Sequence, residues 1–178
     1  MRTLDYTRMR MTPLVGLVWS AGAALAAQGG AGRPAIAVIN LRFDGAHANV
    51  LGPGDTAVVA AATSSLLATL RASEAVTLID SATVAAAVSA AEADGNPCDN
   101  PCAIAVARRL EARWLAKGSI SNLSGLVWQF AAELFDVTTG QPVLVDGYEI
   151  KGDPARMAPL GAHMFAQRVE KAVAGVLH

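Results

Sequence analysis

The stretch that decides the fold spans residues 114–150 and reads WLAKGSISNLSGLVWQFAAELFDVTTGQPVLVDGYEI. It contains three segments of strand length, at residues 114–122, 126–137 and 143–150. The connections between them are short, and the second consists of the turn-forming residues 138–141. Because connections this short join antiparallel neighbours, the stretch predicts a three-stranded antiparallel meander.

Two strand-helix units are predicted before the meander. Residues 35–41, AIAVINL, are a continuous apolar run, which is typical of a strand buried on both faces. A loop over residues 42–54 then leads into a helix with Asp55 as its N-cap. The inward side of this helix is expected to carry Val59, Ala62, Leu66 and Leu70. Residues 75–80, AVTLID, form a second short strand, and this order predicts a right-handed crossover between two parallel strands.

Two further helices are predicted before the meander and one after it. Ser81 is expected to cap the first, and Asn100 the second, with Pro101 at its first helical position. Residues 152–154, Gly-Asp-Pro, open the last helix, which extends to about residue 177. Its apolar stripe, expected to face the core, consists of Met157, Leu160, Met164, Phe165, Val169, Val173 and Val176.

Together these elements predict an α/β fold of the α+β kind. The order is strand-helix-strand-helix-helix, then the antiparallel meander and the C-terminal helix, in a mixed sheet flanked by helices. We expect residues 35–178 to form it as a single domain. The sequence is 53% hydrophobic but only 5% aromatic, so Val, Leu, Ile and Ala are expected to fill most of the core.

Residues 1–26 have the pattern of an export signal. Three arginines give a basic start, residues 13–25 are largely apolar, and Ala24 and Ala26 provide a small-residue cleavage site. We expect cleavage to release a periplasmic protein, with residues 27–34 as a flexible lead-in. The apolar run is too short for a spanning helix, and no lipid-acceptor cysteine lies at the cleavage point. No stable membrane span is therefore expected after cleavage.

The charge of the chain argues against nucleic acid as a partner. The formal net charge is −1, and removal of a leader with three arginines and one aspartate makes it −3. Binding to nucleic acid requires a clustered basic surface that displaces counterions. The one basic cluster, which fits a solvated helix face, consists of Arg108, Arg109, Arg113 and Lys117.

Both cysteines lie in the segment NPCDNPC at residues 96–102. We expect Cys98 and Cys102 to form a structural disulfide, because the two prolines favour turns and an exported protein meets oxidising conditions. Two alternatives stay open. In a redox protein, the helix dipole would lower the pKa of the Cys102 thiol. In a metal site, Asp99 or a distant histidine would complete a thiolate ligand set.

Polar residues that follow the parallel strands are candidate ligand-binding residues. Asp44 and His47 come after the first predicted strand, and Asp80 ends the second. Ligands of open sheets with parallel strands collect beyond the carboxyl ends of those strands. A small ligand or a metal ion bound by these three residues is therefore an alternative function.

The sequence contains no convergent set of catalytic residues, and no cofactor is expected. Trp128 and Phe130 share one face of the long predicted strand, and the last helix is expected to cover one of its two faces. If Trp128 is exposed, it marks a surface that binds a partner protein.

Several segments carry a resemblance to small exported bacterial proteins of a domain-of-unknown-function family: AIAVINL, VTLID, CAIAVARRLEARWLAKGSISNL, FDVTTGQPVL and the Gly-Asp pair before the last helix. The order of elements also resembles the periplasmic module found at the N-terminus of TolB and in the CsgG and LpoB lipoproteins, which has a D-x-x-T-G hairpin turn. Asp136, Thr139 and Gly140 stand at that turn. Because Gly140 can take a positive φ, these residues are expected to be structural.

The resemblance implies a non-enzymatic protein-binding or accessory module of the cell envelope, with another envelope or exported protein as its partner. The chain departs from those modules because it has neither the lipid-acceptor cysteine of the lipoproteins nor the propeller of TolB. A periplasmic sensor of a small ligand or metal and a thiol-disulfide redox protein are the alternatives.

Overall fold

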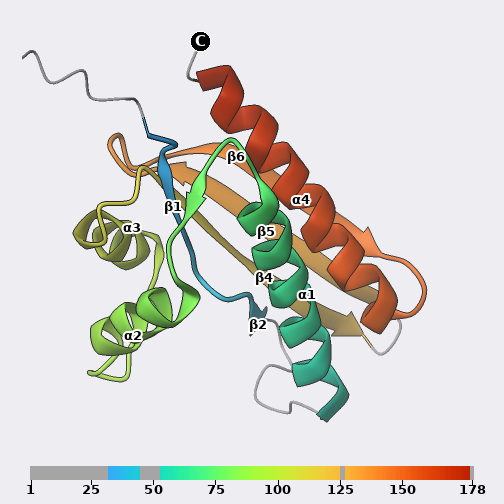
Figure 1. Cartoon of the computed structure of the whole chain (residues 1–178). Coiled ribbons are helices and arrows are strands. Elements are labelled where there is room, and N and C mark those ends of the chain that lie inside the picture. Colours follow the sequence, from blue (N-terminus) through green and yellow to red (C-terminus); the bar gives the residue numbers. More distant parts are fainter. Residues whose placement is uncertain (1–31, 45–52, 125–126, 177–178) are drawn as a thin grey trace, which may run out of the picture. The chain divides into compact units, whose positions relative to one another are not determined.

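The computed structural model describes residues 32–44, 53–124 and 127–176, which form a mixed sheet with helices on both faces (Figure 1). The strands are β1 (Ala35–Val38), β2 (Arg42–Asp44), β3 (Thr77–Leu78), β4 (Trp114–Ser124), β5 (Val127–Asp136) and β6 (Gln141–Ile150). The helices are α1 (Pro53–Ala72), α2 (Ser81–Ala91), α3 (Asn100–Arg109) and α4 (Pro154–Val176). The predicted α/β class is confirmed, and so is the order of elements apart from β2, which the sequence did not predict. The predicted leader lies outside the described residues.

The sheet has the order β3-β1-β4-β5-β6, and β2 pairs with β4 beyond the end of β1. β1 is parallel to both β3 and β4, as expected for strands joined by crossover helices. β4, β5 and β6 are antiparallel neighbours, which confirms the meander. β6 is therefore the outer strand at one edge of the sheet.

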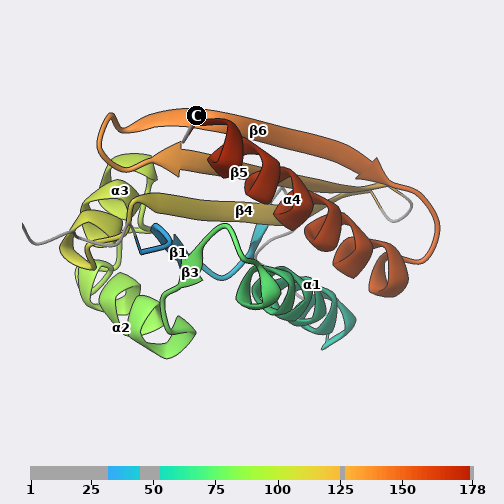
Figure 2. The ribbon, with the colours of Figure 1, turned by 45° about the horizontal axis from the view of Figure 1, so that its top comes forward.

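Alternate residues of β4 face two separate cores. Trp114 and Ile120 belong to the core under α1 and α4, whereas Leu115 belongs to the core under α2 and α3. The two helix pairs therefore cover opposite faces of the sheet, because successive side chains of a strand point to opposite sides. Figures 1 and 2 show α1 and α4 side by side, with α2 and α3 grouped apart from them.

The predicted loop at residues 42–54 is wrong at both of its ends. Arg42 to Asp44 form β2, whose residues pair in parallel with Ser119 to Ser121 on β4. β4 is longer than β1, so the chain after β1 pairs with the free edge of β4. The helix α1 begins at Pro53, which places Asp55 inside the first turn and not at the cap.

The N-caps of α2 and α3 lie one residue before the predicted ones. Asp80 caps α2 by accepting a hydrogen bond from the Thr83 backbone N–H. Asp99 caps α3 by accepting a hydrogen bond from the Cys102 backbone N–H. A carboxylate is a strong acceptor for these otherwise unpaired amides. The side chain of Asn100, the predicted cap, is left free to contact β4 and β5.

The predicted inward stripe of α4 is only half correct. Met157, Leu160 and Met164 are exposed, whereas Phe165 and Val169 are buried. At about 100° of rotation per residue, the first three are centred roughly 130° around the helix from the other two. The buried side also carries small residues that let α4 approach its neighbours: Ala158, Ala162 and Ala166.

Candidate functional site

Side chains from four strands share the part of the sheet that α2 and α3 leave uncovered. In the strand register Arg42 lies beside Ser119, Lys117 beside Glu133, and Glu133 beside Val145. Paired residues point to the same face of a sheet, and none of these side chains is buried. We call this surface the open face, and it comprises Arg42, Asp44, Lys117, Ser119, Ala131, Glu133 and Val145.

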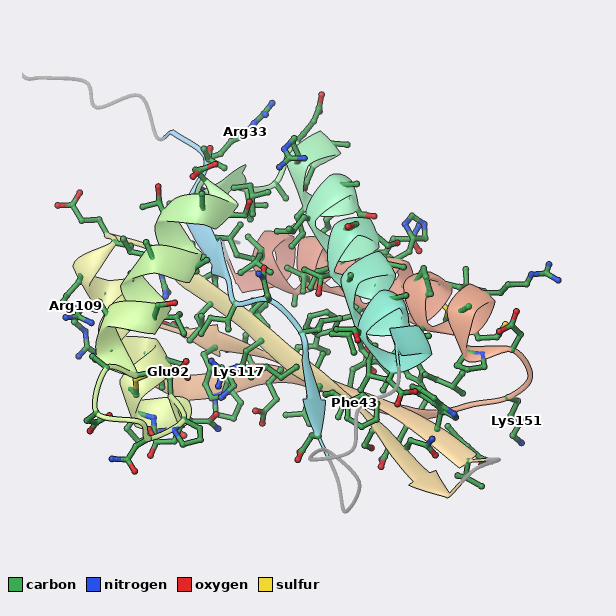
Figure 3. All side chains as sticks on the ribbon, turned by 90° about the horizontal axis from the view of Figure 1, so that it is seen from below. Arg33, Phe43, Glu92, Arg109, Lys117 and Lys151 are labelled. Carbon is green, nitrogen blue, oxygen red and sulfur yellow. A yellow bond between two sulfur atoms is a disulfide. The ribbon has the colours of Figure 1, made fainter. Side chains whose placement is uncertain are left out.

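A cavity of about 560 Å³ lies over the open face. Lys117 and Glu133 belong to its floor, Phe43 of β2 lies at one side, and Pro97 and Asn100 lie at the other. Figure 3 shows Lys117 between the end of α2, where Glu92 lies, and β2, where Phe43 lies. The cavity therefore lies where the open face meets the segment that connects α2 to α3.

Lys117 is the charged group of the cavity whose pKa the cavity surroundings change. Its ammonium donates a hydrogen bond of 2.6 Å to Asn100 Oδ1, and Asn100 Nδ2 lies 3.5 Å from Glu133 Oε2. Burial lowers the pKa of the Lys117 ammonium, and the Glu133 carboxylate opposes part of that effect. Among the described residues Lys117 forms no ion pair within 4.0 Å. A partly buried cation thus faces the cavity without direct neutralisation.

Glu92 connects β2 to the cysteine segment. Its Oε1 atom accepts hydrogen bonds from the Cys98 backbone N–H at 2.6 Å and from Arg42 Nη2 at 2.5 Å. These two contacts, the backbone one first, lower the pKa of the Glu92 carboxyl. The position of the Arg42 guanidinium at the cavity is therefore set by α2 and by the cysteine segment.

Cys98 and Cys102 form the predicted disulfide, with alpha carbons 5.2 Å apart. Cys98 is buried in the core under α2 and α3, and Cys102 lies in the first turn of α3. With the sulfur atoms bonded to each other, no thiolate is present as a metal ligand. The bond ties Asn100, which lies between the two cysteines, into a short closed loop.

The predicted ligand site of Asp44, His47 and Asp80 is not assembled by the described residues. Asp80 follows β3 at the level of Val38, because Ile36 pairs with Leu78. Asp44 pairs with Ser121, five positions along β4 from the partner of Val38, which is about 16 Å. Asp80 is moreover occupied as the N-cap of α2, and His47 lies outside the described residues.

Trp128 and Phe130 do not lie on an accessible surface. Trp128 is 8% exposed and Phe130 is 0% exposed, and both belong to the core under α1 and α4. Trp128 packs edge-on against Phe43, and Phe130 stacks on Tyr148. The condition under which Trp128 would mark a partner surface, its exposure, is not met, because α1 and α4 cover the face that these residues share.

The residues of the D-x-x-T-G motif form the turn between β5 and β6. Asp136 Oδ1 accepts hydrogen bonds from the backbone N–H groups of Thr138 and Thr139, and its carboxylate pairs with Arg113. Gly140 has φ +71° and donates its N–H to the Asp136 carbonyl oxygen. These contacts hold the turn between β5 and β6 in place.

The β6 strand exposes apolar side chains at the edge of the sheet. Val145 is 66% exposed and Val143 is 39% exposed. In the described part of the chain β6 pairs only with β5, so its outer edge presents unpaired backbone groups. The sequence alone identified the strand but not its place at the edge.

Sequence reasoning missed Asn100 and Glu133 as contributors to a site, and it interpreted Lys117 as part of a solvated basic cluster on a helix and its exit. The available signal was a lysine inside a strand-length segment, where a charge marks the less covered face.

No helix among residues 32–44, 53–124 and 127–176 is long and apolar enough to cross a membrane. These same residues contain no cluster of three potential metal-ligating His, Cys, Asp or Glu side chains.

Residues 34–166 match the model of family DUF3280, described as "Protein of unknown function (DUF2380)". The chain belongs to this family. The resemblance to a domain-of-unknown-function family is thus confirmed over most of the chain. No curated protein matches this DUF3280 member.

Several solved structures are similar in fold to this DUF3280 chain. The LpoB C-terminal domain from Escherichia coli is 20% identical, with 72% of this chain and 90% of that chain covered and a TM-score of 0.48. TolB from Acinetobacter baumannii is 16% identical, with 80% of this chain and 28% of the TolB chain covered and a TM-score of 0.48. Lipoprotein GNA1162 from Neisseria meningitidis is 14% identical, with 82% of this chain and 99% of the lipoprotein chain covered and a TM-score of 0.46. LpoB and TolB are two of the three modules that the order of elements resembles in the sequence analysis.

Proposed function

We propose that this protein is a non-enzymatic accessory module of the bacterial periplasm that binds a partner protein through the edge of β6. The observation that carries the proposal is the exposed apolar edge: Val145, at 66% exposure, lies on a strand of ten residues whose outer side is unpaired in the described chain. An exposed edge of this length can pair with a strand of another chain, which proteins otherwise prevent with charges, prolines, bulges or a covering segment.

The chemistry of the edge favours an extended segment of another protein as the partner. Such a segment can add a strand to β6, with its backbone hydrogen bonds providing affinity and its alternate side chains contacting Val145 and the open face. Pro142 near the start of β6 lacks an N–H group, so pairing is favoured over the later residues of the strand.

The periplasmic location rests on two observations. The export signal expected at residues 1–26 directs the chain out of the cytosol, and the disulfide between Cys98 and Cys102 is typical of an oxidising compartment. Two observations on the described residues support the non-enzymatic role. They contain no cluster of three potential metal-ligating side chains. Thr69 Oγ1 lies 2.9 Å from His163 Nδ1, but its hydroxyl also lies within hydrogen-bonding distance of the Ser65 carbonyl oxygen, as expected for a structural contact.

A site-specific crosslink in the native host tests the proposal. A photo-crosslinking amino acid replaces Val145 at the edge of β6 or, as the control, Ala86, which is exposed on α2. We expect a covalent adduct with an envelope or exported protein from position 145 and none from position 86. A V145K variant, which places a charge on the edge, is expected to remove that partner from copurified material.

Three outcomes would contradict the proposal. The first is equal adducts from both positions, the second is no adduct from position 145, and the third is undiminished copurification with V145K. If purified protein alone gives a crosslinked dimer at position 145, the edge binds a second copy and the accessory role is wrong.

A further inference from the structure

We propose that the cavity on the open face is a binding site for a single carboxylate group, held by the Lys117 ammonium with help from Arg42. The cationic groups of the site lie on β2 and β4, whereas the proposed function uses the outer edge of β6, and Val145 belongs to both. Purified protein and small probes test the site without the partner protein.

Two cationic side chains converge on this cavity. Arg42 lies beside Ser119 in the parallel register of β2 and β4, and Lys117 lies two positions before Ser119 on the same face. Both side chains line the cavity. The positive charge of Arg42 is one of the causes that lower the pKa of Lys117, after burial. A negative group placed between the two cations would relieve this repulsion.

Both cations keep donors for a ligand. An ammonium has three N–H donors, and the protein acceptor found for Lys117 in the described chain is Asn100 Oδ1. A guanidinium has five, and Arg42 donates one to Glu92. Asn100 and Glu92 each hold one of the two head groups by a hydrogen bond. The remaining donors are held in place without a large loss of side-chain entropy on binding.

The carboxylates nearby limit the charge of the ligand. Glu133 lies directly across from Lys117 in the antiparallel register, and Asp44 also lines the cavity. These two groups repel any anion, and they repel a phosphate with more than one negative charge more strongly than a carboxylate. A carboxylate carries a single charge and accepts two hydrogen bonds in one plane, which suits two separate cationic donors.

Apolar side chains around the cavity define the rest of the ligand. Pro97 and Val145 line it together with the charged groups. They can contact a short hydrocarbon or aromatic part next to the carboxylate. The ligand is thus a small apolar acid, or a carboxylate side chain supplied by a partner protein.

Titration of the purified exported protein, followed by the backbone amide signals in NMR, tests the inference. The probes are benzoate, inorganic phosphate and the blocked peptide acetyl-Gly-Glu-Gly-amide. Three isosteric or near-isosteric variants accompany the wild type: K117Q, E133Q and K151Q. Lys151 is exposed and lies well away from Lys117 in the view of Figure 3, so it serves as the matched control.

We expect the backbone amide signals of Lys117, Ser119 and Ala131 to show saturable chemical-shift changes with a carboxylate probe. The changes with phosphate are expected to be weaker. K117Q is expected to weaken binding about tenfold or more, because a charged hydrogen bond is lost. E133Q is expected to strengthen it by about two- to fivefold, because a repelling charge is removed. K151Q is expected to bind as the wild type does. Opposite effects of K117Q and E133Q cannot both come from a loss of folding.

The comparison of probes identifies the source of the carboxylate. Tighter binding of benzoate indicates a free organic acid, and tighter binding of the peptide indicates an acidic side chain of a partner. The inference is overturned if neither carboxylate probe, benzoate or the peptide, gives saturable chemical-shift changes. It is also overturned if phosphate binds as tightly as benzoate, or if K117Q and K151Q bind benzoate with the same affinity.

Discussion

The hydroxyl group of Tyr148 on β6 donates a hydrogen bond to the carbonyl oxygen of Gly161 on α4. Gly161 is buried in the middle of the helix, and the Tyr148 ring lies against it. On its other side the ring stacks on Phe130 of β5, with centroids 5.0 Å apart. This contact fixes the distance between the C-terminal helix and the outer strand, so it holds the edge that we propose as the partner surface.

The close approach of Tyr148 makes Gly161 intolerant of any side chain. A Cβ atom at position 161 would lie 2.6 Å from Tyr148 Cε2 and 3.0 Å from its hydroxyl oxygen. We expect G161A to lower the free energy of unfolding by about 1–3 kcal/mol, as overpacking does elsewhere. Urea denaturation measures it. Gly175 on the same helix has no atom within 4 Å of such a Cβ, so G175A is expected to be neutral or stabilising by about 0.5 kcal/mol. Equal effects of the two substitutions would show that the ring does not restrict α4.

The ion pair of Arg113 and Asp136 is expected to make the free energy of unfolding depend on pH. The Arg113 hydrogen bond, together with the N–H groups of Thr139 and Thr138, holds the pKa of the Asp136 carboxyl below its usual 3.8. A carboxyl whose pKa is lower in the folded state stabilises the protein above the unfolded pKa, and this contribution is lost as the pH falls through the folded pKa.

We therefore expect the unfolding free energy of the wild type to fall below about pH 4, and to fall less steeply in D136N. Urea denaturation at a series of pH values gives both slopes. R113M removes the largest cause of the shift and is expected to flatten the slope as well. A wild-type slope retained in both variants would contradict this role of the pair.

The two sides of α4 are expected to differ sharply in their response to substitution. Phe165 is 0% exposed, and F165A is expected to cost about 3–5 kcal/mol. Leu160 is 48% exposed, and L160S is expected to change stability by less than about 0.5 kcal/mol. Thermal denaturation of both variants distinguishes the observed orientation of α4 from the one that its sequence suggested. A large loss in L160S would indicate that another chain or segment covers this side.

The disulfide is expected to contribute modestly to stability. It closes a loop with a sequence separation of only 4, so the chain-entropy model gives about 2 kcal/mol or less. We expect C98A combined with C102A to remain folded, with a correspondingly lower urea midpoint and with weaker benzoate binding, because Asn100 loses its closed loop. Unfolding of the double variant at room temperature would show that the bond holds more of the fold than its loop length suggests.

Most of the architecture was predictable from local patterns. The alternation in β5 and the turn residues around Gly140 predicted the meander, because strand pairing across a short turn is a local event. Helix ends were misplaced by about one residue at Asp80 and Asp99, because several polar residues there are competent caps and only the backbone angles select one.

The candidate site was not predictable in the same way. Lys117 and Glu133 become neighbours only through the register of β4 and β5, and Arg42 joins them only because β2 pairs with β4. None of these pairings follows from a spacing in the sequence. The aromatic residue chosen from the sequence, Trp128, is buried because α1 and α4 cover its face of the sheet.

The sequence by itself determined the order of strands and helices, the turn at Gly140 and the pairing of the two cysteines, since each depends on residues close together in the chain. Only the tertiary structure decided which face of each element is buried and which strand lies at the edge. The physical reason is that burial depends on what packs against a side chain. Val145 is exposed on β6 because it faces the part of the sheet that α2 and α3 leave uncovered, and the outer edge of β6 is unpaired in the described chain.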